Sequence, residues 1–386
     1  MIQANAIEFN VPTMIVHGPD VINRIAEQAA EYGDKVMIVT QGKFTRKLGL
    51  VNKVETLLER KKVKYITFDS IRTNPDNEII DEGAALAHQS RCNLIIALGS
   101  SSSINAAKAI SLMAMNEGPT VEYLNGRYHE KLPLPVIAIP TVPGSFVDIN
   151  DSFSIVDQND SDKKVYRHRD LFPIATLVDP KIMITLPPNY TAGTGISITG
   201  AAIECYISSS SNAISDALSI QAMDFVTSNI KHIMGDRDNV EARGHIAMAG
   251  ILASIALLIG HRGACHALAM TLAAHAGIYE RIANVIILPH VMEFNLTATP
   301  GKYVQIARSL GEEVSQITVV EAAIKAVEGV RKLLFDLKIP QRLSEYKIKK
   351  DHLPMIASHA RRYQFLNYVP RPLSKEDLLN VLISAY

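Results

Sequence analysis

The sequence predicts an α/β domain over residues 1–183, followed by an all-helical domain over residues 184–386. Three observations support this prediction. A chain of 386 residues is too long for one ordinary hydrophobic core. Its first half alternates short β-branched runs with amphipathic segments, which is the pattern of an α/β layer fold. From about Pro188 onward the strand-like runs stop, and long stretches rich in Ala, Ile and Leu follow one another.

In the first half, four runs predict strands and the segments between them predict helices. The strands are expected at residues 35–40, 64–68, 93–98 and 136–139. The helices are expected at residues 21–32, 51–61 and 77–89. The third run is apolar on both faces, as in a strand buried within a parallel sheet. Farther on, the acidic residues 157–162 lack the glycine and the closing glutamate of a calcium loop, and so predict a solvated hairpin turn.

The second half predicts a succession of long helices. They are expected at residues 190–208, 212–235, 239–261, 263–279 and 284–297, with several more to the end. The apolar run 246–260 is short for a membrane span and rich in Ala and Gly, so we expect a buried central helix. The domain boundary lies near residue 185, and the cleft between two such domains is the expected place for a ligand.

The composition excludes several classes of partner. Lys plus Arg and Asp plus Glu both total 39, so there is no strong field to collect nucleic acid or an anionic membrane. The three cysteines, Cys92, Cys205 and Cys265, have no paired spacing and predict neither disulfides nor a zinc site. We therefore expect a soluble, cytoplasmic protein that binds neither nucleic acid nor membrane.

A turn rich in small residues, from Gly99 to Lys108, lies where a buried strand ends and a helix begins. Small residues there let a phosphate approach the backbone N–H groups at the helix N-terminus, where the helix dipole favours an anion. The serine hydroxyls in the turn can also donate to phosphate oxygens. The turn therefore predicts a nucleotide site, although a serine-rich helix cap would have the same sequence.

This turn resembles the signature GGGSxxDxAK of the iron-containing (group III) alcohol dehydrogenases. The matching positions are Gly99, Ser102, Ile104, Ala107 and Lys108, whereas Ser100 and Ser101 replace glycines and Asn105 replaces the Asp. Residues 139–145 resemble the family's I-P-T-T-A-G-T, with Thr141 and Gly144 retained. Further landmarks match in order at residues 177–180, 186–188, 191–192, 216–218 and 287–295, so the resemblance covers nearly the whole chain.

The resemblance implies the dehydroquinate synthase-like architecture of that family and an NAD(P)-dependent interconversion of an alcohol and an aldehyde or ketone. It implies a small-molecule alcohol or carbonyl substrate and a homodimer. Carried over to this chain, the residues expected to hold the cofactor are Gly99, Ser100, Ser102, Ser103, Thr141, Ser145 and Lys163, with Lys164 as the alternative to Lys163.

Cofactor choice depends on the end of the first predicted strand. Many NAD-preferring relatives have an Asp where Gln41 stands, which binds the adenosine ribose hydroxyls. Gln41 has no charge to repel a 2′-phosphate, and Lys43 follows closely enough to attract one. We therefore expect NADPH to bind at least as tightly as NADH, unless Lys43 is only a solvated loop lysine.

The family's metal site is incomplete in this sequence. The resemblance places its four ligands, one Asp and three His, at Ser197, Ala201, His266 and Glu280, and a further family His is Met270 here. Only two donors remain for an iron or zinc ion, which usually has three protein ligands in a catalytic site. His266 and Glu280 are thus both the candidate metal ligands and the candidate catalytic pair. Without a metal, His266 is the expected proton donor, because an imidazole titrates near neutral pH.

Two other functions are compatible with these residues. One is a catalytically silent paralogue that binds a nucleotide or a partner without turnover. The other is a different reaction on the same scaffold, as in the sugar-cyclising relatives of this fold. Fold alone does not choose among them.

Overall fold

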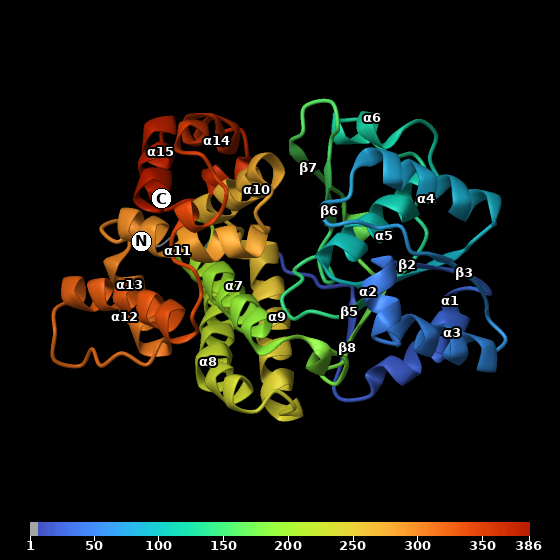
Figure 1. The fold of residues 1–386 in the computed structure, drawn as a ribbon, viewed down its shortest axis with the longest axis horizontal. Helices are drawn as coiled ribbons and strands as arrows, with labels where there is room; N and C mark the ends of the chain where they lie inside the picture. The colour runs from blue at the N-terminus through green and yellow to red at the C-terminus, as the bar shows by residue number, and fades with distance from the viewer. Residues whose placement is uncertain (1–6) are drawn as a thin grey trace.

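The computed structural model describes residues 7–386, and within them two domains lie side by side (Figure 1). The N-terminal domain is an α/β layer structure, and the C-terminal domain is built from helices. The last strand of the main sheet ends at Val178, and the first long helix of the second domain begins at Pro188. The fold class predicted from the sequence is confirmed.

Within the described residues, the main sheet has six parallel strands in the order β1-β8-β5-β4-β2-β3. These strands are β1 (Met14–His17), β2 (Lys35–Thr40), β3 (Lys64–Phe68), β4 (Leu94–Gly99), β5 (Val136–Pro140) and β8 (Ala175–Val178). The four strands predicted from the sequence are β2 to β5. The short strands β1 and β8 were not predicted, because four residues are too few to show a clear hydrophobic pattern.

Helices cover both faces of this sheet. On one face α4 (Asn77–Gln89) and α5 (Ser101–Met113) pack on Met37, Val39, Ile95 and Ala97. On the other face α1 (Ile25–Tyr32) and α3 (Leu50–Arg60) pack on Val36, Ile38, Leu94 and Ile96. The shorter helices are η1 (Val21–Arg24), α2 (Gly42–Lys47) and α6 (Thr120–Leu124). Because β2 and β4 are apolar on both sides, each can be buried between two helical layers.

A separate antiparallel hairpin, β6 (Ser152–Val156) and β7 (Lys163–Arg167), projects from this domain beside the helical domain (Figure 1). Residues 157–162 form its turn, as predicted. The turn is not simply solvated, because the carboxylate of Asp157 is almost fully buried and accepts a hydrogen bond from Lys164 Nζ at 2.6 Å.

The helical domain consists of long helices that follow the second half of the chain. They are α7 (Pro188–Ile207), α8 (Ala213–Gly235), α9 (Val240–Gly260), α10 (Ala264–Ala276), α11 (Glu280–Asn295), α12 (Pro300–Ser309), α13 (Val319–Asp336), α14 (Leu353–Ala360) and α15 (Lys375–Ser384). By length and composition α9 is apolar enough to cross a membrane, but it packs against α7 and α8. Its residues Ala247 and Ile251 also join the core beneath the sheet. The predicted buried central helix is therefore confirmed, and it connects the two domains.

One contact between the domains is backbone against backbone. A Cβ atom on Gly250, in the middle of α9, would lie 2.5 Å from the backbone nitrogen of Gly144. Gly144 itself has a φ of +63°, which favours glycine, and it belongs to the loop that follows β5. Because both residues are glycines, the backbone of α9 packs directly against the backbone of this loop.

Replacing Gly250 with Ala is expected to destabilise the protein by about 1–3 kcal/mol, because neither backbone can move aside without strain. Gly301→Ala is the control, since nothing lies within 4 Å of a Cβ there; we expect it to stay within about 1 kcal/mol of the parent. Urea unfolding of the two variants measures both effects. Equal stabilities would show that the loop yields freely to α9.

Candidate functional site

The turn between β4 and α5 is shaped by Gly99. Its φ is +148°, and a Cβ atom there would lie 2.4 Å from the hydroxyl of Ser103. The Gly99 carbonyl accepts a hydrogen bond from the backbone N–H of Thr141 at 2.9 Å, which joins the turn to the loop after β5. The sequence-predicted residues Gly99, Ser103 and Thr141 are thus brought together at the carboxyl ends of two neighbouring strands.

The N-terminus of α5 is available to an anion. The N-cap residue is Ser100, but its side chain caps none of the helix N–H groups; the hydroxyl donates instead to Oε1 of Gln41 at 2.7 Å. The Ser103 hydroxyl is buried and, within the part of the chain that the structure describes, has no hydrogen-bond partner. Uncapped N–H groups beside an unpaired buried hydroxyl fit a pyrophosphate. The residues present therefore fit a dinucleotide.

Gln41 and Lys43 follow the carboxyl end of β2, the strand next to β4 in the sheet. Gln41 follows β2 and is joined to the turn through Ser100, as described above. Lys43 is exposed on α2. Its neighbour Arg46 forms an ion pair with Asp69, with 2.9 Å between Nε and Oδ2. Among the residues that the structure describes, the Lys43 ammonium has no ion-pair partner, so it can meet a charge from solvent.

Lys108 anchors the loop that follows β5. It is fully buried, and its ammonium donates to the carbonyl of Val147 at 3.2 Å and to the carbonyl and side-chain oxygen of Asn150 at 2.8 and 2.7 Å. Burial lowers the pKa of Lys108 to about 7. In the same loop the Ser145 hydroxyl donates to the buried carboxyl of Asp148. The family-matched lysine therefore fixes the loop from beneath, and the Ser145 hydroxyl is already engaged within it.

The two surviving metal-ligand positions face each other in the helical domain. Nδ1 of His266, on α10, lies 3.5 Å from Oε1 of Glu280, the first residue of α11. Lys163, from β7 of the other domain, donates to Oε2 of Glu280 at 2.7 Å, and its side chain is 9% exposed. The structure thus unites His266, Glu280 and Lys163, which lie up to 117 residues apart in the sequence.

A second cation joins this group, which the sequence reasoning missed. Nη1 of Arg262 lies 3.3 Å from Nδ1 of His266 and donates to it. The Arg262 guanidinium also lies over the ring of Phe146, 4.2 Å from its centroid, so it too connects the helical domain to the loop after β5. In the sequence, only its place just before Gly263 and the helix that carries His266 could have pointed to Arg262 as a residue of this site.

Glu204 positions the helix that carries His266. From α7, its carboxylate accepts the backbone N–H of Cys265 at 2.7 Å and so caps the N-terminus of α10. Burial raises the pKa of Glu204 to about 7. Glu204 thus fixes the start of α10, and with it the position of His266.

The electrostatics of the pair differ from what the residue types alone suggest. Burial, together with the charge of Arg262, lowers the pKa of His266 well below its usual range. Burial acts to raise the pKa of Glu280, but the charge and the hydrogen bond of Lys163, together with the charge of Arg262, outweigh it and hold this pKa at about 2. At neutral pH His266 is therefore a neutral imidazole beside an ionised carboxylate. The near-neutral titration expected for His266 does not hold in this environment.

These residues do not fit the family's divalent metal. Ser197 and Ala201 lie buried on α7 and provide neither a carboxylate nor an imidazole. The remaining donors, His266 and Glu280, are held by two cations. Over residues 7–386, the clusters of three or more His, Cys, Asp or Glu donors do not include them. A dication between Nδ1 of His266 and Glu280 would have to displace Arg262 from that nitrogen, and it would gain only two protein ligands.

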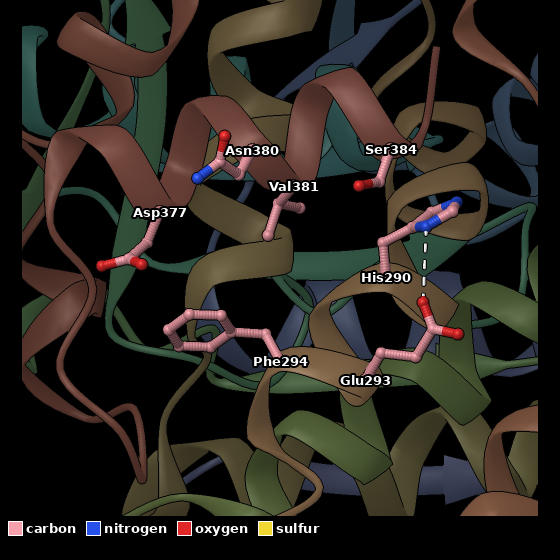
Figure 2. A pocket seen from close by; sticks show the side chains of 7 residues that line it. All are labelled: His290, Glu293, Phe294, Asp377, Asn380, Val381 and Ser384. Atoms are coloured by element: carbon pink, nitrogen blue, oxygen red, sulfur yellow. Dashed lines mark ion pairs between the residues drawn. The ribbon is translucent and has the colours of Figure 1, made fainter.

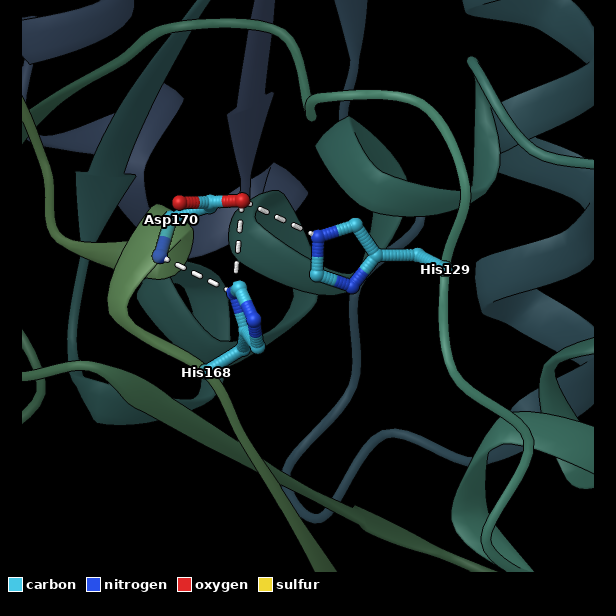
Figure 3. A group of neighbouring side chains, drawn as sticks. All are labelled: His129, His168 and Asp170. Carbon is cyan, nitrogen blue, oxygen red and sulfur yellow. Dashed lines mark hydrogen bonds and ion pairs between the residues drawn. The ribbon is translucent and has the colours of Figure 1, made fainter.

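Two other groups of such donors lie elsewhere, and neither was predicted. One comprises His129, His168 and Asp170 (Figure 3). The other comprises Asp162, His275 and His359. A surface hollow between α11 and α15 contains none of the predicted site residues (Figure 2); its lining is His290, Glu293, Phe294, Asp377, Asn380, Val381 and Ser384.

Comparison with known proteins agrees with this geometry. Residues 12–180 match the family model "Iron-containing alcohol dehydrogenase", and residues 191–386 match the model of the C-terminal part of the same family. The chain is 27% identical over 381 residues to 1,3-propanediol dehydrogenase of Klebsiella pneumoniae, covering 98% of both. It is 28% identical over 372 residues to lactaldehyde reductase of Escherichia coli (strain K12), covering 96% of this chain and 97% of the relative. A crystal structure of 1,3-propanediol oxidoreductase superposes with a TM-score of 0.95 at 27% identity, over 99% of this chain and 100% of that one.

Changing Gly99 to Ala is expected to weaken dinucleotide binding at least about tenfold, because the added methyl group enters the space of the Ser103 hydroxyl in the turn. Gly49→Ala is a matched control: Gly49 also has a positive φ, of +72°, but nothing lies within 4 Å of its Cβ position. Fluorescence titration with NADH and NADPH compares the two variants. Equal losses would mean that backbone strain alone, and not the turn, governs binding.

Proposed function

The chain belongs to the iron-containing alcohol dehydrogenase family, and we propose that it interconverts a small alcohol and its aldehyde or ketone with a nicotinamide dinucleotide, without a metal at the family's ligand positions. The observation that carries this proposal is the pair of cations, Lys163 and Arg262, which engage the only two donors left at those positions. The names of the relatives, 1,3-propanediol dehydrogenase and lactaldehyde reductase, support a small alcohol or aldehyde as the substrate.

The cofactor is proposed to lie across the turn at the start of α5. The N–H groups of that turn and the Ser102 and Ser103 hydroxyls would hold the pyrophosphate, and Gln41 and Lys43 would face the adenosine ribose. Thr141 and the backbone of Ser145 would line the nicotinamide side, as the resemblance implies. A bound nicotinamide supplies the hydride for reduction and accepts it in the reverse direction.

The protein must then stabilise the negative charge that develops on the substrate oxygen. In the family a metal does so. In this chain the Lys163 ammonium and the Arg262 guanidinium are positive charges that lie beside His266. With one ionised carboxylate, Glu280, and a neutral His266, these two cations leave the group with a net positive charge. An anionic alkoxide is therefore favoured beside them.

The two cations have different roles in this proposal. Arg262 keeps its protons at any physiological pH, so it stabilises charge without transferring a proton. The Lys163 ammonium carries an exchangeable proton and is the proposed donor to the alkoxide. His266 and Glu280 act by holding the two cations, His266 through its contact with Arg262 and Glu280 through its ion pair with Lys163.

After treatment with a chelator, the protein is expected to consume NADH or NADPH with at least one member of a panel of small aldehydes, and added Fe²⁺ should not raise kcat. Lys163→Met and Arg262→Met should each lower kcat roughly a hundredfold, because each removes a charge that stabilises the alkoxide. Lys164→Met is the matched control: it lies next in the same strand, but its ammonium pairs with Asp157 and Asp160. Turnover that requires Fe²⁺ would contradict the proposal. Dinucleotide binding without turnover would favour the silent paralogue.

We further propose that NADPH binds at least as tightly as NADH. Lys43→Ala is expected to weaken NADPH about tenfold, through loss of one charge-assisted contact with the 2′-phosphate, and to leave NADH unchanged. Lys53→Ala, which removes one charge from α3 of the same domain, is the control. Parallel titrations with both dinucleotides measure the effect, and equal weakening of the two would place Lys43 away from the 2′-phosphate.

A further inference from the structure

A group of side chains joins the two domains at one side of the cleft, apart from the reacting residues proposed above. Asp162 ends the turn between β6 and β7, His275 lies in the last turn of α10, and His359 lies on α14. We propose that these three residues form a binding site for a divalent transition-metal ion of the zinc class, which would link the hairpin to the helical domain.

The three donor atoms converge. Nε2 of His275 and Nδ1 of His359 each lie 2.8 Å from the same oxygen, Oδ1 of Asp162. The two imidazole rings lie 4.3 Å apart between centroids. In a tetrahedral zinc site, bonds of about 2.0–2.1 Å hold the ligand atoms about 3.3 Å from one another. Separating the donors by about half an ångström would make room for the ion.

The chemistry of the donor set is that of a transition-metal site. Two imidazoles and one carboxylate are ligands that zinc prefers, and a solvent molecule can complete the coordination. Nη1 of Arg362 lies 3.0 Å from the other oxygen of Asp162, Oδ2, and so orients the carboxylate while leaving Oδ1 to the ion. The side chains are 11–20% exposed, so an ion has access from solvent.

Without an ion, the same atoms interact as hydrogen bonds, each imidazole donating an N–H to Oδ1. Binding requires each ring to carry its proton on the other nitrogen, which has no hydrogen-bond partner among the residues described for either histidine. Both tautomers are readily reached by a neutral imidazole. The hydrogen-bonded and ion-bound states therefore need no large rearrangement between them.

The second histidine group differs in the state of its donors (Figure 3). Its nitrogens lie farther from the carboxylate of Asp170, at 3.2 Å for His129 and 3.3 Å for His168. Nδ1 of His168 also accepts the backbone N–H of Asp170, and Nδ1 of His129 faces the Tyr166 hydroxyl at 2.8 Å. An ion there would have to break a local turn. This group therefore serves as the comparison rather than as a second proposal.

An ion at Asp162 would act on the position of Lys163, the next residue along the chain. The backbone carbonyl of Lys163 already accepts a hydrogen bond from the Tyr363 hydroxyl at 3.0 Å. Linking Asp162 to His275 and His359 would fix the hairpin on both sides of this point, across the boundary between the domains. The proposed role is structural, and it does not depend on the proposed reaction.

The test uses the full-length protein after removal of metal with a chelator. Zn²⁺ is titrated by calorimetry, and Co²⁺ by its visible absorption, which reports tetrahedral nitrogen and oxygen coordination. We expect one equivalent to bind, and the unfolding temperature to rise by about 4 °C at a hundredfold excess over Kd. His275→Ala and His359→Ala should each weaken binding about a hundredfold or more.

Two controls locate the ion. His168→Ala, in the comparison group, and Glu280→Gln, in the cleft, should both leave Zn²⁺ affinity unchanged. Loss of binding in either variant would place the ion elsewhere and overturn the proposal. So would a wild-type protein that binds no Zn²⁺ at 100 μM concentration, roughly the range of a weak site, and this result would stand even if the histidine variants failed to fold. The readouts are stoichiometry and stability, so they are independent of turnover.

Discussion

The ion pair between Lys163 and Glu280 is the contact on which the arrangement of charges between the two domains depends. It joins β7 of one domain to the first turn of α11 in the other, with the ammonium almost fully removed from water. Burying two charges carries a desolvation cost, which is recovered only when the geometry is close and further polar contacts are present. The charge of Arg262 also favours the ionised form of Glu280, and the hydrogen bond to His266 holds that guanidinium in place. The cluster is thus balanced as a unit, and removing either member of the pair would leave the other as an uncompensated charge.

This balance is compatible with Ser197 and Ala201 at two of the positions where the resemblance places metal ligands. In the proposed reaction, Lys163 and Arg262 stabilise the negative charge on the substrate oxygen, as a metal ion would. Unlike a metal ion, these side chains need no set of protein ligands to hold them. Ser197 and Ala201, being small, need no partner of that kind, and both are buried in α7. The capping of α10 by Glu204 keeps His266 in place independently of any ion. The scaffold of the family therefore persists around a different charge arrangement.

The turn at the start of α5 followed closely from the sequence. Gly99 and the serines after it were recognisable because the conformation of a strand-to-helix turn depends on neighbouring residues, and local sequence reports it directly. The charged group between the two domains was harder to predict from the sequence. His266 and Glu280 were identified through family spacing, but the contacts that determine their ionisation come from Lys163 and Arg262. The pKa of His266 was therefore misjudged, since residue type alone does not report burial or a neighbouring guanidinium.

By itself the sequence determined the strands β2 to β5 with helices between them, the helical second half, the turn at Gly99, and the lack of a carboxylate or an imidazole at positions 197 and 201. Hydrophobic periodicity, glycine conformation and residue chemistry are all local properties, so these features could be seen without coordinates. Only the tertiary structure decided which charges meet. Lys163 reaches Glu280 across 117 residues, and His359 reaches Asp162 across 197. Such contacts depend on how the hairpin and the helical domain pack together, and no local pattern in the sequence records that packing.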